Sequence, residues 1–187
     1  MACVTGIAKN ITSNCTTQPV GGLEVVAYLW KRGDMTITYD GTSPNKVTGI
    51  VAVGAALVYK YTGVKKNLNA GHDRTVSEDI ADAFKHFLSL KAFETDTLSV
   101  LNIDGLGDIC AVVEYKNKVT SADGVFVGYG LKSGLYPTTD TRRANDANGI
   151  RSIEMTSRDQ EDEPYSQYNI LVTDYATTKS TLEALLT

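Results

Sequence analysis

The sequence has few of the residues on which disulfide frameworks and metal sites depend. It contains three cysteines (Cys3, Cys15 and Cys110) and two histidines (His72 and His86). No two cysteines form a Cys-x-x-Cys pair, and an odd count argues against a disulfide framework. The two histidines stand fourteen residues apart, which is not the spacing of a zinc-binding pair. The sequence therefore predicts free thiols and no bound metal.

Long apolar runs and leader patterns are also missing. No run reaches the roughly 18 residues that a membrane-spanning helix needs. The first fifteen residues lack a basic segment followed by an apolar one, which predicts that no signal peptide is present. From these patterns we expect a protein that makes no contact with a membrane and stays in the cytoplasm where it is made.

Motifs of catalysis and nucleotide binding are absent from the sequence. There is neither a P-loop nor a nucleophile-elbow pentapeptide. Gly128, Gly130 and Gly134 are spaced one residue too widely for the dinucleotide fingerprint, and this spacing predicts a hairpin between two strands. Because no nucleophile, base and orienting group stand out as a set, we expect a protein that is not an enzyme and holds no cofactor.

Charge is modest in total but uneven along the chain. The 187 residues carry 18 Lys and Arg against 22 Asp and Glu, a formal net charge of −4, which argues against a general nucleic-acid binder. Residues 1–93 hold ten basic and seven acidic residues (+3), whereas residues 94–187 hold eight and fifteen (−7). This asymmetry either suits a subunit that meets copies of itself head to tail, or is accidental.

Alternating apolar and β-branched residues recur through the chain and predict short strands. Residues 75–94 fit both a helical face and a strand, and a helical turn at 77–83 followed by a strand at 84–94 satisfies both patterns. Short helices are expected at 96–103, with Leu98 and Leu101 facing inward, and at 178–186. The other expected strands are residues 23–30, 35–39, 47–53, 56–61, 109–115, 124–130, 150–157 and 168–172.

This order of elements has no strand–helix–strand alternation and predicts a β-rich α+β fold, a β-sandwich or partial barrel flanked by one short helix. The chain 1–187 is expected to form a single domain. Extended segments are expected as an N-terminal arm at 1–22, a long loop at 62–78 and a C-terminal arm at 173–187. Such segments suit an assembly subunit, because neighbouring copies can cover an arm that its own domain cannot.

Charged residues in the expected loops are the candidates for contacts between subunits. An acidic run before Pro164 can form an exposed electrostatic contact or bind a hard cation. The pair Arg142–Arg143 can form an ion pair between subunits, lie in a solvated turn, or contact a phosphate. The interface candidates are Lys65, Lys66, Arg74, Arg142, Arg143, Asp159, Glu161, Asp162 and Glu163.

Several sequence signatures resemble a known family of virion proteins. They include Asn14-Cys15 with Pro19 and Gly21-Gly22, and the strand Ile109–Tyr115 followed by Gly128-x-Gly130 and Gly134-Leu135. The others are Val47-Thr48-Gly49-Ile50, Asp79 with Lys85-His86, Asn148-Gly149, Glu154-Met155 and Glu161-Asp162-Glu163-Pro164. Over residues 14–172, except 116–123, the chain resembles tail-tube-type structural proteins of tailed bacteriophages and prophages of Bacteroides-type bacteria.

The resemblance implies a structural subunit of a phage tail tube. Such subunits form rings, usually of six copies, whose inner sheets join into one barrel around a channel through which DNA passes. It implies the helix at 96–103, a strand at 84–94, and a long loop at 62–78 that joins successive rings. The expected partners are further copies and other tail or neck proteins, and the expected location is the virion, after synthesis in the bacterial cytoplasm. A neck, collar or tail-terminator ring protein and a host-binding virion module are the alternatives.

Overall fold

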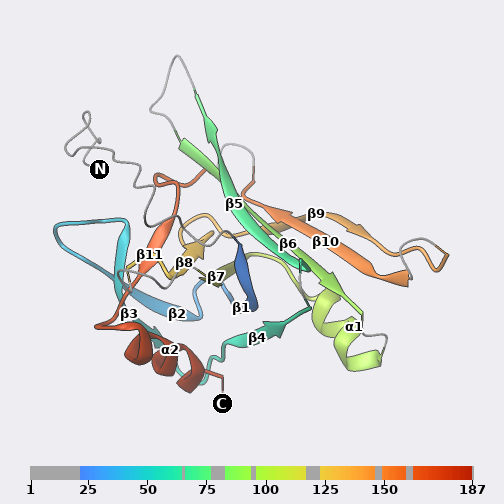
Figure 1. The fold of residues 1–187 in the computed structure, drawn as a ribbon, viewed down its shortest axis with the longest axis horizontal. Coiled ribbons are helices and arrows are strands. Elements are labelled where there is room, and N and C mark those ends of the chain that lie inside the picture. Colours follow the sequence, from blue (N-terminus) through green and yellow to red (C-terminus); the bar gives the residue numbers. More distant parts are fainter. Residues whose placement is uncertain are drawn as a thin grey trace.

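The computed structural model describes residues 22–64, 66–76, 83–93, 96–116, 123–145, 149–158 and 162–186. Two β-sheets pack against each other (Figure 1). The strands are β1 (Leu23–Lys31), β2 (Met35–Tyr39), β3 (Lys46–Ala52), β4 (Tyr59–Thr62), β5 (Leu68–Thr75), β6 (Ala83–Ala92), β7 (Ile109–Tyr115), β8 (Phe126–Tyr129), β9 (Tyr136–Thr141), β10 (Arg151–Thr156) and β11 (Tyr168–Ile170), and the helices are α1 (Thr97–Asp104) and α2 (Tyr175–Ala184).

The larger sheet, which we call sheet A, has the strand order β2-β3-β11-β8-β7-β1-β4. Strand β7, in the interior of this sheet, is buried at six of its seven positions, because both faces of the sheet are covered. Cys110 and Val112 join the hydrophobic core on one face, and Ala111 and Val113 join the core on the other. A strand buried on both faces is apolar without alternation, as the sequence of β7 is.

The smaller sheet, sheet B, has the strand order β5-β6-β10-β9 and is antiparallel throughout. One of its faces is apolar and packs on sheet A through Leu88, Leu90, Ile153 and Met155. The opposite face is mainly polar. The alternation of β6 follows from this arrangement, since a strand covered on one side alternates buried and exposed side chains.

The two helices differ in how they contact the sheets. Each begins after an aspartate whose carboxylate accepts hydrogen bonds from backbone amides of the first turn, Asp96 for α1 and Asp174 for α2, a standard N-cap. Helix α2 packs on sheet A and buries Leu182 in the core. Helix α1 buries none of its residues. No helix in the described part of the chain is long and apolar enough to span a membrane.

The β-rich α+β class and most predicted elements are confirmed, among them the helix near 96–103 and a strand in place of the helical alternative from residue 83 onward. The two sheets do not close into a barrel. Of the predicted arm 1–22, all but Gly22 lies outside the described residues. The same holds for most of the helical turn at 77–83.

Three sequence-based predictions are corrected by the structure. The expected loop 62–78 contains strand β5, which pairs with β6 over eight residues. Its sequence does not alternate because it is an edge strand that is mostly exposed. The expected arm 173–187 does not extend away from the domain, because α2, close to the helix predicted at 178–186, packs on sheet A. The glycine turn at 130–134 is not a hairpin, because β8 pairs with β7 and β11 in sheet A while β9 pairs with β10 in sheet B. It carries the chain from one sheet to the other.

Candidate functional site: an open sheet and an apolar cleft

The predicted interface residues do not form one surface. Lys65, Asp159 and Glu161 lie outside the described residues. Lys66 precedes β5, and Arg142 and Arg143 follow β9, so these three lie toward the same end of sheet B. Arg74 is exposed at the opposite end, with its guanidinium 5.9 Å from the centre of the Phe84 ring. Asp162 and Glu163 also lie toward that end, since Glu163 bridges to Phe84.

Glu163 is a correction, because it cannot be a contact between subunits. Its side chain is 0% exposed. The carboxylate oxygen Oε1 accepts hydrogen bonds of 2.9 Å from the backbone amides of Lys132 and Ser133, and Oε2 accepts one of 2.7 Å from the Tyr168 hydroxyl. Its backbone exchanges two hydrogen bonds of 2.8 Å with Phe84. Glu163 therefore holds the glycine turn against both sheets, whereas its sequence context predicted a solvated loop.

His86, at the centre of the interface between the sheets, is fully buried and has a partner for each ring nitrogen. Nδ1 accepts a hydrogen bond of 3.0 Å from the Gly130 amide, and Nε2 donates one of 2.9 Å to the carbonyl oxygen of Tyr165. Loss of hydration on burial lowers the pKa of His86. A neutral imidazole satisfies both bonds, so this histidine has a structural role.

Cys110 has a similar role beside the same turn. Its thiol donates a hydrogen bond of 3.2 Å to the carbonyl oxygen of Gly130. Burial raises the pKa of the thiol to about 12, which keeps it protonated and unreactive. The turn itself requires glycine at position 130, where φ is +68° and an added Cβ would lie 2.6 Å from Cγ of Leu135.

The described residues offer no metal site, since no three or more His, Cys, Asp or Glu side chains are grouped there so as to hold an ion. Asp162 lies in the described part of the loop after β10. It is half-buried and its Oδ1 atom has no hydrogen-bond partner. His86, Glu163 and Cys110 are thus engaged in structural hydrogen bonds, which form a clamp between the sheets at the glycine turn.

Sheet B is open at both edges within the described part of the chain. β5 and β9 each pair with a single neighbour, β6 and β10 respectively. Successive side chains of a strand point to opposite faces of the sheet. The residues that alternate with those packed on sheet A therefore form the polar face. This face comprises Asn69, Asp73, Lys85, Phe87, Ser89, Lys91, Thr139, Thr141, Ser152, Glu154 and Thr156.

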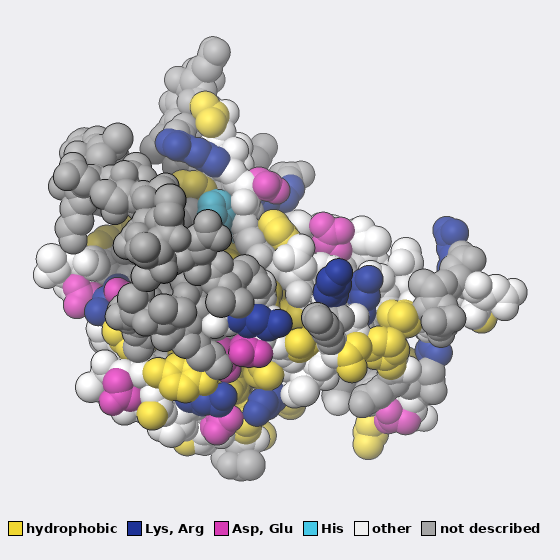
Figure 2. All heavy atoms as spheres, in the orientation of Figure 1, with side chains coloured by type: hydrophobic (Ala, Val, Ile, Leu, Met, Phe, Trp, Pro, Cys, Tyr) yellow, Lys and Arg dark blue, Asp and Glu magenta, His cyan; other side chains and the backbone are white. Residues whose placement is uncertain are grey.

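An apolar cleft of about 870 Å³ lies where the β6 end of sheet B meets β4, the end of β1 and helix α1. Leu101, which lines the cleft, is 60% exposed, and Leu98, on the same helix but outside the lining, is 73% exposed. Phe93 and Val64 are also more than half exposed. Figure 2 shows hydrophobic side chains gathered over the region of α1. Patches of this kind mark interaction surfaces, and the sequence pattern of α1 had predicted Leu98 and Leu101 to face inward.

Comparison with known proteins adds no relative: no family model, no curated protein and no solved structure matches this chain. Its function is therefore argued from the sheets and surfaces described above.

Proposed function

We propose that this protein is a structural subunit of a phage tail tube, which self-assembles into stacked rings around a channel that conducts DNA. The resemblance of the sequence to tail-tube-type proteins motivates the proposal, and the open, fully antiparallel sheet B is the structural observation that supports it. The proposal makes further copies and other tail or neck proteins its partners, and places it in the virion after synthesis in the host cytoplasm.

The direction of the edge strands favours lateral assembly. Four strands that alternate in direction leave β5 and β9, the two edges, running in opposite directions. When β5 of one copy lies beside β9 of the next, the new pair is therefore antiparallel, like every pair within sheet B. Pairing of this kind protects edges that otherwise invite aggregation. Repeated with a rotation that returns to its starting point, such pairing forms a closed ring.

The sequence of β9 limits which part of it pairs. Pro137, near its start, has no amide hydrogen and is suited to a sheet edge. Residues 138–141 remain to bond with a neighbour. β5 is longer, eight residues, so the two edges can overlap over about four residues, enough for a short strand pair.

The polar face of sheet B is suited to line a channel for DNA. The charged residues on its strands are Asp73, Lys85, Lys91 and Glu154, two of each sign, and Ser, Thr and Asn provide much of the rest. Arg158, just after β10, adds one positive charge beside Lys85 and Thr156. DNA affinity rises with the number of phosphates that basic residues neutralise. A wall with little net charge is expected to bind DNA weakly, so that DNA can slide through.

Lysines on one edge strand provide a direct test. We expect T139K/T141K on β9 to block lateral pairing, because edge lysines prevent strand addition. The matched control is T36K/T38K, which places two lysines at the same spacing on exposed positions of β2, an edge of sheet A. Mass photometry and negative-stain microscopy of purified protein measure rings and tubes.

We expect rings or tubes with a central hole for the unmodified protein and for T36K/T38K, and monomers for T139K/T141K. Single rings that never stack at high concentration would instead support a neck, collar or terminator protein. Monomers of the unmodified protein at all concentrations, or equal assembly of both lysine variants, would overturn the proposal.

A further inference from the structure

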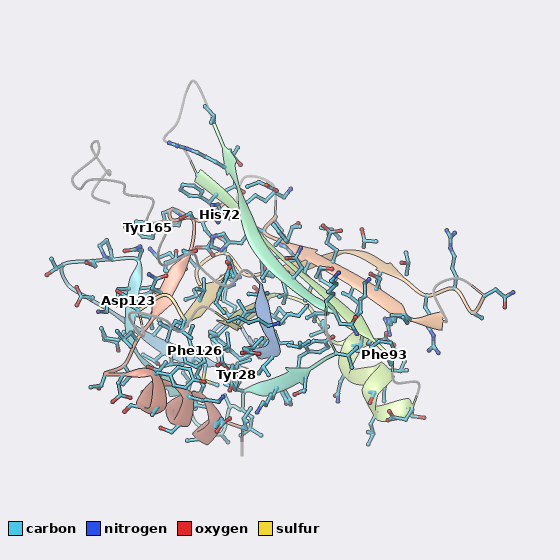
Figure 3. All side chains as sticks on the ribbon, in the orientation of Figure 1. Tyr28, His72, Phe93, Asp123, Phe126 and Tyr165 are labelled. Carbon is cyan, nitrogen blue, oxygen red and sulfur yellow. The ribbon has the colours of Figure 1, made fainter. Side chains whose placement is uncertain are left out.

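The cleft beside α1 has a floor of core residues. Leu29 and Ile109 from sheet A and Leu90 and Ile153 from sheet B line it, and all four are buried in the core between the sheets. Phe93, which Figure 3 shows beside α1, also lines the cleft and is half exposed. The volume of about 870 Å³ lies within the range of ligand-binding pockets, about 300–1,000 Å³. The cleft therefore has the size and the lining to hold a small apolar molecule.

Helix α1 forms one wall of the cleft and exposes apolar surface there. Asp104, its last residue, accepts a hydrogen bond of 2.6 Å from Arg151 of β10, which ties the helix to sheet B. Ile103 packs against the core, whereas Leu101 lines the cleft and stays mostly exposed. A molecule that covers Leu101 removes apolar surface from water, which favours binding.

The described residues that line the cleft include three lysines and no acidic residue. Two of these lysines direct their side chains away from it. Lys60 lies over the ring of Tyr28 and is paired with Glu183 of α2 at 3.4 Å, on the opposite face of sheet A. Lys91 alternates with Leu90 along β6, so its side chain belongs to the polar face of sheet B.

Lys31 is the remaining lysine of the lining, and it lies on the cleft side of sheet A. It stands two residues beyond Leu29 on β1, so the two side chains share one face of the sheet. Lys31 is exposed and has no ion pair with any described residue. Tyr59 pairs with Leu29 in the register of β1 and β4 and brings an exposed side chain to the same face. One end of the cleft therefore offers a positive charge and a phenolic hydroxyl.

We propose that the cleft binds one molecule of a long-chain fatty acid in its ionised form. The carboxylate lies at Lys31 and the Tyr59 hydroxyl, and the alkyl chain runs along β4 between Tyr61 and Leu101, over the apolar floor. A positive charge without an acidic neighbour in the lining selects an anionic head group, and burial of the chain provides the affinity. Such binding requires no assembly into rings, so it does not depend on the proposed function.

Isothermal titration calorimetry with laurate, below the concentration at which it forms micelles, tests the proposal. We expect saturable binding of one laurate per chain. Decanoate is two methylene groups shorter and should bind roughly tenfold more weakly, because each buried methylene contributes to affinity. Dodecyltrimethylammonium has the chain length of laurate with a cationic head group, and should bind more weakly than laurate because Lys31 repels it.

Two pairs of variants at exposed positions locate the site. Lys31→Gln should weaken laurate binding about fivefold, the upper end for an exposed ion pair. Its control, Lys91→Gln, removes an exposed lysine from the other face of sheet B and should leave binding unchanged. Leu101→Gln should likewise weaken binding about fivefold, through lost apolar contact. Leu98→Gln, on the same helix but outside the lining, should not weaken it.

The absence of saturable laurate binding would overturn the inference. So would equal laurate affinity in Lys31→Gln and Lys91→Gln, or in Leu101→Gln and Leu98→Gln, because the bound molecule would then lie elsewhere. Rings or tubes formed by a protein that does not bind laurate would leave the proposed function standing. Specific laurate binding by a protein that stays monomeric at all concentrations would support the inference and overturn the proposed function.

Discussion

Removal of the Glu163 carboxylate is the most informative perturbation of the clamp between the sheets. The Glu163→Ala variant deprives the amides of Lys132 and Ser133 and the Tyr168 hydroxyl of their shared acceptor. A hydrogen bond to a charged group contributes about 1.5–3 kcal/mol, so three of them set an upper bound of roughly 5–9 kcal/mol. Hydrogen bonds to one acceptor are not independent, and water can enter the vacated space. We therefore expect the free energy of unfolding to fall by about 4 kcal/mol.

Unfolding in urea, followed by tryptophan fluorescence, measures this loss directly, since the single tryptophan, Trp30, is 1% exposed in the core of sheet A. For a chain of this size, 1 kcal/mol corresponds to about 2–4 °C in Tm. The thermal midpoint should accordingly fall by roughly 8–16 °C. The control is Glu154→Ala, an exposed carboxylate on β10, for which we expect a change within about 0.5 kcal/mol.

Glu163→Gln separates the charge from the shape of the side chain. Gln retains one acceptor for the two amides but presents an amide group to Tyr168, whose hydroxyl must then turn to accept. We expect an intermediate loss of about 2 kcal/mol, the difference between charged and neutral hydrogen bonds. The view that Glu163 holds the turn would be refuted if Glu163→Ala lowered the free energy of unfolding by less than about 1 kcal/mol. It would also be refuted if Glu163→Ala were no less stable than Glu154→Ala.

Three further outcomes are expected around the same turn. Gly130→Ala should lower the free energy of unfolding by about 2–4 kcal/mol in urea titrations, because a Cβ there is strained and meets Leu135. In a C3S/C15S background, Cys110, whose pKa is raised to about 12 by burial, should react with iodoacetamide at pH 8 only in denaturant. Burial lowers the pKa of His86, so the unfolded chain binds more protons below about pH 6.5. Stability should therefore fall as the pH is lowered from 7 to 5, with a shallower slope in His86→Gln.

Position in the sheet decided how well each strand was predicted. β7 is buried on both faces, so its side chains alone mark it as a strand, and the predicted range 109–115 matches the structure. β5 is an edge strand of polar residues, and it forms because β6 offers a paired neighbour. A polar edge strand has no periodic signal of its own, which explains why 62–78 was predicted as a loop.

The acidic run before Pro164 shows that local sequence can also mispredict the environment of a single side chain. In the sequence Glu163 has acidic neighbours, a pattern typical of a solvated loop. In the structure it bridges to Phe84 and faces two backbone amides from a turn about thirty residues away in sequence. Burial of a carboxylate depends on hydrogen-bond donors that the fold brings to it. These donors cannot be identified from the neighbouring sequence.

The sequence by itself determined the β-rich class, the helix after Asp96 and the central strands, because capping and apolar patterning act over a few neighbouring residues. Only the tertiary structure decided which side chains are buried and which surfaces are open. It divided the strands into two sheets, left β5 and β9 as edges running in opposite directions, and opened a cleft at one end of sheet B. These features depend on contacts between residues far apart in the chain, which is why they required the folded structure.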